Sequence, residues 1–129
     1  MTSINLSYLN TNKVTKMVSL LEDCISLQSI DFSNFNTKNV VTTGSMFYNC
    51  TSLTSIYLIF NTQNVTRMSY MFYNCYSLTN INITQFNTKK LTSMNSMIER
   101  CSNISNLDIT NFNIENVREM QYLFQVYEL

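Results

Sequence analysis

The sequence predicts an α/β repeat protein: a solenoid of about five coils, each with one short parallel strand and one short helix or 3-10 turn. Two observations lead to this prediction. The pentapeptide MFYNC occurs at 46–50 and again at 71–75. The four cysteines, Cys24, Cys50, Cys75 and Cys101, follow one another at intervals of 26, 25 and 26 residues. A fixed period of this length is typical of stacked repeat arrays.

The same period divides the chain into units. Each unit is marked by one apolar residue that precedes Asn, namely Leu9, Phe35, Phe60, Phe86 and Phe112. We therefore expect residues 1–129 to form a single repeat domain. Neither end carries a distinct capping unit, so we expect the domain to be a segment of a longer array or its ends to stack on another copy.

A strand is expected after each cysteine, where the pattern L-x-x-I-x-L recurs. Its last two apolar positions alternate with polar residues, which indicates a strand with one buried face. Stacked units would align these strands in parallel. The five strands are expected near residues 5, 31, 57, 82 and 108.

A short helix is expected after each marker residue. Val65, Met68, Met71 and Phe72 lie at positions i, i+3, i+6 and i+7, a spacing that fits one or two helical or 3-10 turns. Two sets of threonines are alternative caps for these turns, and the sequence does not choose between them. One set is Thr15, Thr66 and Thr92, and the other is Thr37, Thr62 and Thr88.

The repeated MFYNC is explained by this arrangement. Asn49 and Asn74 are expected at the end of the helical turn in the left-handed conformation, which Asn tolerates better than most residues. The cysteine that follows is expected inside the protein as a small apolar side chain. Repeat-equivalent cysteines form a row, so we prefer buried free thiols to disulfides or a four-cysteine metal site.

Composition excludes several functions. The chain has no histidine and a single glycine, so it has no Ser-His or Cys-His pair and no phosphate-binding glycine loop. Formal net charge is zero and charged residues make up 12%, which argues against nucleic-acid binding. No apolar run is long enough for a membrane span, and the N-terminus lacks the pattern of a signal peptide. We expect no enzyme activity, no cofactor and no metal.

The segment FNTQNVTRMSYMFYNCYSLTNINITQFNT resembles the BspA-like bacterial surface-protein repeat, a 26-residue leucine-rich repeat. The resemblance covers nearly the whole chain, with departures at Ile114 and at Met97-Ile98. It implies a leucine-rich-repeat fold, a location at the cell surface or in a secreted protein as part of a longer chain, and an adhesive role. It brings no catalytic residues.

Two functional hypotheses follow. The first is a non-catalytic interaction module of an adhesin-like protein, which binds a protein or an extracellular-matrix ligand. The second is a structural spacer without a ligand of its own. Outward strand positions are nearly all Ser, Asn, Asp or Thr, except Tyr57 and Ile59. Because exposed aromatics are favoured anchors, the candidate binding site is Tyr57 and Ile59, with Asp31 and Asn82 as its polar rim. The alternative is drift of the repeat, which leaves an exposed apolar pair without a function.

Overall fold

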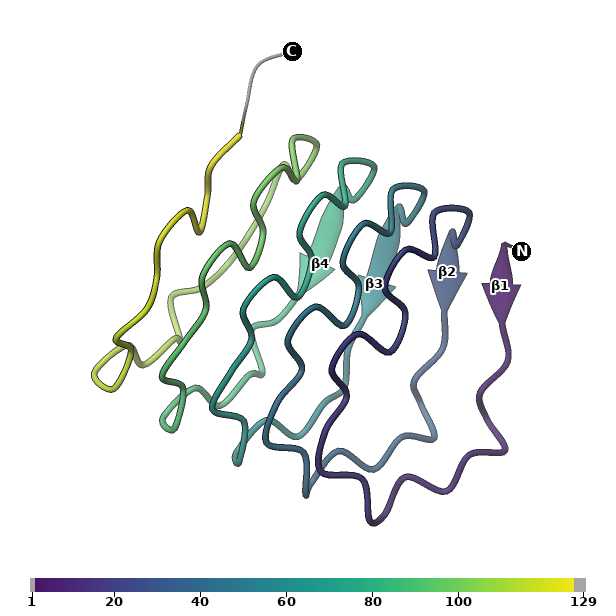
Figure 1. The fold of residues 1–129 in the computed structure, drawn as a ribbon, viewed down its shortest axis with the longest axis horizontal. Coiled ribbons are helices and arrows are strands. Elements are labelled where there is room, and N and C mark those ends of the chain that lie inside the picture. The colour runs from purple at the N-terminus through teal and green to yellow at the C-terminus, as the bar shows by residue number, and fades with distance from the viewer. Residues whose placement is uncertain (1, 127–129) are drawn as a thin grey trace.

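The computed structural model describes residues 2–126, in which the chain winds through similar units stacked side by side (Figure 1). The N-terminus lies at one end of the stack and the C-terminal unit at the other. Four strands occur in these residues: β1 (Ser3–Ile4), β2 (Ser29–Ile30), β3 (Ser55–Tyr57) and β4 (Asn80–Asn82). They pair in parallel as two separate sheets, β1 with β2 and β3 with β4.

The predicted fold class, an α/β leucine-rich-repeat solenoid of strand-plus-helix coils, is wrong. No helix occurs in residues 2–126, and most of this part of the chain is neither helix nor strand. Residues 2–126 therefore contain no helix that could cross a membrane. The strands are only two or three residues long, and near residue 108 there is a single bridge, Asn80 to Asn106, in place of the fifth strand.

A backbone ladder between units replaces the expected helices. The amide of Phe47 donates to the carbonyl of Met71 at 2.9 Å, and that of Asn49 donates to the carbonyl of Tyr73 at 2.8 Å. The amide of Tyr48, which lies between them, donates within its own unit to the carbonyl of Ser45 at 3.0 Å. Alternate amides therefore join neighbouring units, a pattern that a helix, with all amides paired internally, does not allow.

Left-handed residues interrupt any helix in these segments. In four units they come in pairs four residues apart, with φ between 52° and 63°: Ser19 and Asp23, Ser45 and Asn49, Tyr70 and Asn74, Ser96 and Arg100. In the last unit Tyr122 has φ 58°. The left-handed conformation predicted for Asn49 and Asn74 is confirmed, but it belongs to a turn and not to a helix end. Each non-glycine residue in this conformation costs about 1–2 kcal/mol, which the bonds between units must offset.

Buried threonines join the units a second time. The Thr62 hydroxyl accepts from the Asn87 amide at 2.7 Å and donates to the Asn87 carbonyl at 3.2 Å. Thr37 and Thr88 make the same pair of bonds to Asn61 and Asn113. Neither set of threonines caps a helix, because the segments are not helical. The recurring F-N-T is instead a connection between neighbouring units.

The core runs through the stack between the strands and the amide ladder. Its central side chains are almost completely buried, among them Val40, Phe47, Leu53, Met68, Phe72 and Leu78. The Phe47 and Phe72 rings stack with centroids 5.2 Å apart. Cys50, Cys75 and Cys101 are buried as predicted, and Cys24 is half-buried. The extent of the domain, 1–129, and its place in a longer array stay predictions; residues 1 and 127–129 lie outside the described part.

Candidate functional site

The outward face of the strands carries the candidate site. Along residues 55–59 the side chains alternate, with Ile56 and Leu58 buried and Tyr57 and Ile59 exposed by 63% and 45%. This alternation follows from the extended backbone, in which successive side chains point to opposite faces. The register of β3 and β4 places Tyr57 opposite Asn82. These two predicted site residues are therefore neighbours on one surface.

Most residues at the Tyr57 position of the repeat close a turn. Asp108 accepts bonds from the Thr110 amide at 2.9 Å and from its hydroxyl at 2.6 Å. Asn82 holds Thr84 in the same way, at 3.3 and 2.9 Å. Such Asx turns end an extended segment by giving the backbone a local partner.

The third unit lacks this turn. Asn5 with Ser7 and Asp31 with Ser33 make it in the first two units. In the third unit Tyr57 stands where the acceptor is expected and Ile59 where the donor is expected. Both halves of one structural motif are thus replaced by large apolar side chains that remain exposed.

A hollow of about 490 Å³ lies beside Tyr57 on this face. Its polar lining comes from β3, β4 and the segment after them: Ser55, Asn80, Asn82, Thr84, Asn106 and Asp108. Amides and hydroxyls of this kind both donate and accept hydrogen bonds, while the Tyr57 ring offers apolar area. We call Tyr57 together with these residues the strand-face hollow.

The structure brings together only part of the predicted site. Tyr57 and Asn82 line the strand-face hollow, whereas Ile59 and Asp31 do not. Asp31 follows β2, which belongs to the other sheet, and its carboxylate is bonded to Ser33. Asp108 lines the hollow in its place. The period-2 alternation marks Asn80, Asn106 and Asp108 as outward residues, so a sequence signal for them existed.

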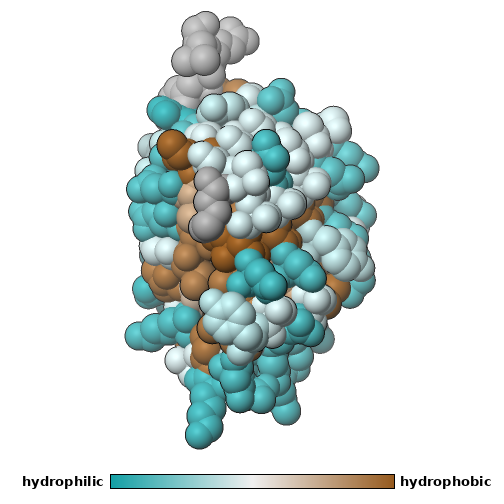
Figure 2. Space-filling view, turned by 90° about the vertical axis from the view of Figure 1, so that its right-hand side faces the viewer, coloured by the Kyte–Doolittle hydropathy of each residue, from teal (hydrophilic) through white to brown (hydrophobic). Residues whose placement is uncertain are grey.

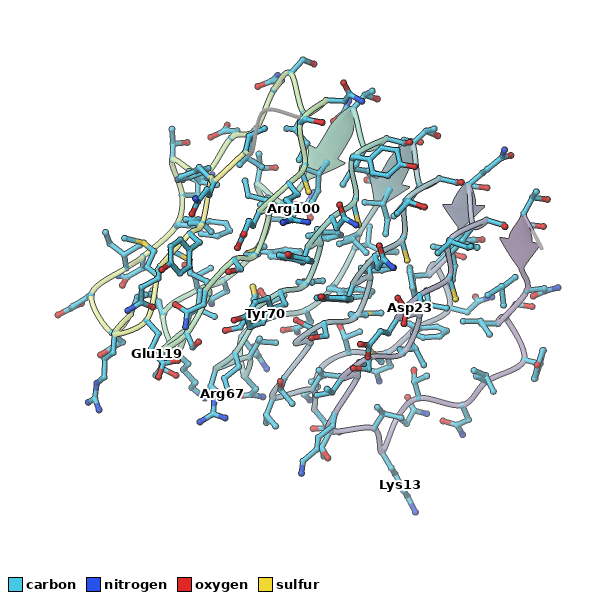
Figure 3. The ribbon with its side chains drawn as sticks, turned by 45° about the horizontal axis from the view of Figure 1, so that its top comes forward. Lys13, Asp23, Arg67, Tyr70, Arg100 and Glu119 are labelled. Atoms are coloured by element: carbon cyan, nitrogen blue, oxygen red, sulfur yellow. The ribbon has the colours of Figure 1, made fainter. Side chains whose placement is uncertain are left out.

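The charges around the strand-face hollow are few. Hydrogen bonds from the Thr110 hydroxyl, and then from its amide, hold the pKa of Asp108 below its usual value. Asp31 also has a lowered pKa, chiefly because the Ser33 amide donates to it. Basic side chains such as Lys13 and Arg67 extend outward from separate units and form no common patch with each other (Figure 3).

A second group of aromatic side chains lies on the amide-ladder side. The Tyr48 and Tyr73 rings stack with centroids 4.7 Å apart, and the Arg100 guanidinium lies 5.7 Å from the centre of the Tyr73 ring. Beside them Asn74 donates to Asn49 at 2.7 Å. These rings and amides contact one another from unit to unit, so their arrangement is explained by packing within the stack.

The cysteine row lies inside the stack, with one thiol in each of four units. Among residues 2–126 no three His, Cys, Asp or Glu side chains lie close enough together to hold a metal ion. The thiols of Cys50, Cys75 and Cys101 each donate to a carbonyl in the preceding unit, at 2.9–3.1 Å. Burial raises the pKa of Cys50 to about 12, and a hydrogen bond with Cys101 and burial raise that of Cys75. Raised pKa values keep the Cys50 and Cys75 thiols protonated and unreactive at neutral pH.

The chain belongs to the family described as "Mycoplasma protein of unknown function, DUF285", which matches residues 2–58 and 54–128. The two matches together span nearly the whole chain; the first covers about two repeat units and the second about three. No curated protein and no solved structure matches the chain.

Proposed function

We propose that this protein is a non-catalytic interaction module that binds a protein or extracellular-matrix ligand through the strand-face hollow. The observation that carries the proposal is the third unit, where Tyr57 and Ile59 replace an Asx turn and stay exposed beside a polar hollow. Loss of a stabilising turn in favour of an exposed aromatic is the change expected at a binding anchor.

The composition of the hollow supports binding without catalysis. It offers amides, hydroxyls and the Asp108 carboxylate, whose pKa is lowered and not raised toward neutrality as a general acid would need. The repeat's resemblance to BspA-like bacterial surface proteins supports a place at the cell surface or in a secreted protein, as part of a longer chain. Neither feature favours nucleic acid as the ligand.

The test compares binding of the chain and of two variants to a panel of immobilised, purified extracellular-matrix proteins. In Tyr57→Asp with Ile59→Thr the third unit regains the D-x-T turn of the fifth, and binding should fall at least about tenfold, as for loss of an interface anchor. Tyr76→Ser removes a tyrosine that is 48% exposed outside the hollow, and should leave binding unchanged. Equal binding by both variants would favour the alternative, a structural spacer.

A further inference from the structure

Side chains at the same repeat position differ in exposure between the inside of the stack and its two ends. Phe124 is 56% exposed, although the same repeat position is 4% exposed at Leu21 and completely buried at Phe47. Met120 is 45% exposed, whereas Met17 is 3% exposed. These positions are buried in the first unit, which has a unit after it, and exposed in the last. The last unit therefore presents a surface on which a following unit packs.

The first unit shows the converse. Leu20 is 41% exposed, but its repeat equivalents Met46 and Leu123 are 0% and 9% exposed. Leu123 lies in the last unit and has a unit before it, so Leu20 is a position that a preceding unit covers. Figure 2 views this N-terminal end and shows a hydrophobic band across its middle, framed by hydrophilic side chains.

The backbone ladder gives the two ends opposite polarity. Along the amide ladder the amide of one unit donates to a carbonyl of the following unit, as Ser19 donates to Gly44 at 3.1 Å and Leu21 to Met46 at 2.9 Å. Just before this segment, and beside the strands, the direction is reversed, as Val41 donates to Thr15 at 2.8 Å. Within the amide ladder the last unit therefore presents donors and the first unit presents acceptors. A head-to-tail contact pairs donors with acceptors, whereas contacts between like ends do not.

The exposed groups follow this rule. The amides of Met120, Tyr122 and Phe124 have no acceptor within residues 2–126. Val18 and Leu20 are the repeat equivalents of Gly44 and Met46 in the first unit. Their carbonyls accept no backbone hydrogen bond from residues 2–126. Backbone groups left without partners next to apolar side chains favour a contact that pairs them.

Charge is complementary as well. Parallel bridges link Lys16 to Thr42, Thr42 to Arg67, Arg67 to Ser93, and Ser93 to Glu119. If this column continued into another copy, Glu119 of the first copy would lie beside Lys16 of the second. An apolar hollow of about 320 Å³, lined in part by Ile104, Leu107 and Phe124, is open on the last unit.

We propose that the C-terminal end of one copy of this chain stacks on the N-terminal end of a second copy, continuing the amide ladder and the core. The contact is head to tail, so it leaves one free end of each kind and extends into an open series instead of closing as a symmetric dimer. This assembly does not depend on a ligand of the strand-face hollow.

One position in the last unit weakens the contact. The threonines that bond each unit to the next end at Thr88, and Ile114 takes the equivalent place with 54% exposure. The amide of Asn10 in a second copy would therefore lack the hydroxyl acceptor that Thr88 gives Asn113 at 2.7 Å. Ile114→Thr should tighten the contact.

The experiment is sedimentation velocity over a dilution series. The chain should show a concentration-dependent series of species, and Ile114→Thr should shift that series to lower concentration by about tenfold, the effect of restoring a buried hydrogen-bond pair. Leu20→Lys and Phe124→Lys should each be monomeric, because each places a charge in one half of the apolar contact. Val41→Lys, at a side position that is 38% exposed, is the matched control and should assemble normally.

Mixing the two end variants gives the decisive result. Leu20→Lys retains a working C-terminal end and Phe124→Lys a working N-terminal end, so the mixture should form a one-to-one heterodimer and nothing larger. Circular dichroism melting of each variant establishes that it is folded. A chain that stays monomeric at every concentration, or a mixture that stays monomeric while the chain assembles, would overturn the proposal.

Discussion

The Sγ atom of Cys75 lies 3.1 Å from the carbonyl oxygen of Phe47, a residue of the preceding unit. Cys50 and Cys101 repeat the relationship with Leu21 and Phe72. The regular spacing of these cysteines therefore places their buried thiols in a row, and each thiol contacts the preceding unit.

The first prediction concerns these thiols. Cys50, Cys75 and Cys101 should react slowly with a thiol reagent in the folded protein and together on unfolding, because all three are buried. A titration with and without denaturant measures this. Fewer than four reactive thiols in denaturant without reductant would reveal disulfides and contradict the free-thiol assignment.

Alkaline pH should weaken the fold through the same thiols. The pKa of Cys50 is raised from 9.0 to about 12 by burial, so the unfolded state loses its proton first. The stabilising contribution is full below pH 9 and is lost as pH rises toward 12. The free energy of unfolding, measured with urea at several alkaline pH values, should fall less steeply with pH for Cys50→Ala than for the unchanged chain.

The threonine connections give the second prediction. Thr62→Val keeps the shape of the buried side chain but leaves the Asn87 amide without its acceptor, which should cost about 1–3 kcal/mol in the free energy of unfolding. Thr79→Val removes one bond from an exposed threonine and should change stability by about 0.5 kcal/mol or less. Equal effects in chemical denaturation would show that Thr62 does not join the units.

The third prediction addresses the left-handed residues. Ser45 has φ 54°, and its side chain makes no hydrogen bond within residues 2–126, so Ser45→Gly should raise the free energy of unfolding by about 0.5–1 kcal/mol. Asn49 has φ 59°, but its side chain also donates to Asp23 at 2.8 Å and accepts from Asn74. Asn49→Gly should therefore gain less or lose stability. If Ser45→Gly destabilised the protein, the left-handed assignment would be wrong.

The fourth prediction tests the Asx turns. The Thr110 hydroxyl is the largest cause of the lowered pKa of Asp108, so Thr110→Val should raise this pKa toward 3.8 while that of Asp31 stays unchanged. The turn's contribution to stability is present above pH 3.8 and is lost as pH falls through the lower folded pKa. Carboxyl carbon shifts followed by NMR report both residues at once, and an unmoved Asp108 would exclude the hydroxyl contact.

The sequence predicted features that depend on local chemistry. Alternation along residues 55–59 identified Tyr57 and Ile59 as exposed, and the tolerance of Asn for left-handed backbone identified Asn49 and Asn74. It could not identify Tyr70 and Ser45 as left-handed, because neither residue type favours that conformation.

The helix prediction failed for a related reason. Spacing of i, i+3, i+6 and i+7 places apolar side chains on one side both in a helix and in this turned segment. The choice between them depends on the carbonyl that each amide meets, and the partner of Phe47 is Met71, a whole unit away. Asp31, predicted as part of the polar rim, follows β2 and does not line the strand-face hollow; the sequence does not show that β2 and β3 lie in different sheets.

The ladder between units underlies both the strand-face hollow and the end surfaces, and NMR couplings across hydrogen bonds test it most directly. The amide nitrogen of Phe47 should couple to the carbonyl carbon of Met71, which accepts from it at 2.9 Å, and that of Phe72 to Met97, at 2.8 Å. Coupling of Phe47 to Thr43 instead, the carbonyl four residues earlier in its own unit, would show a helix and contradict the account.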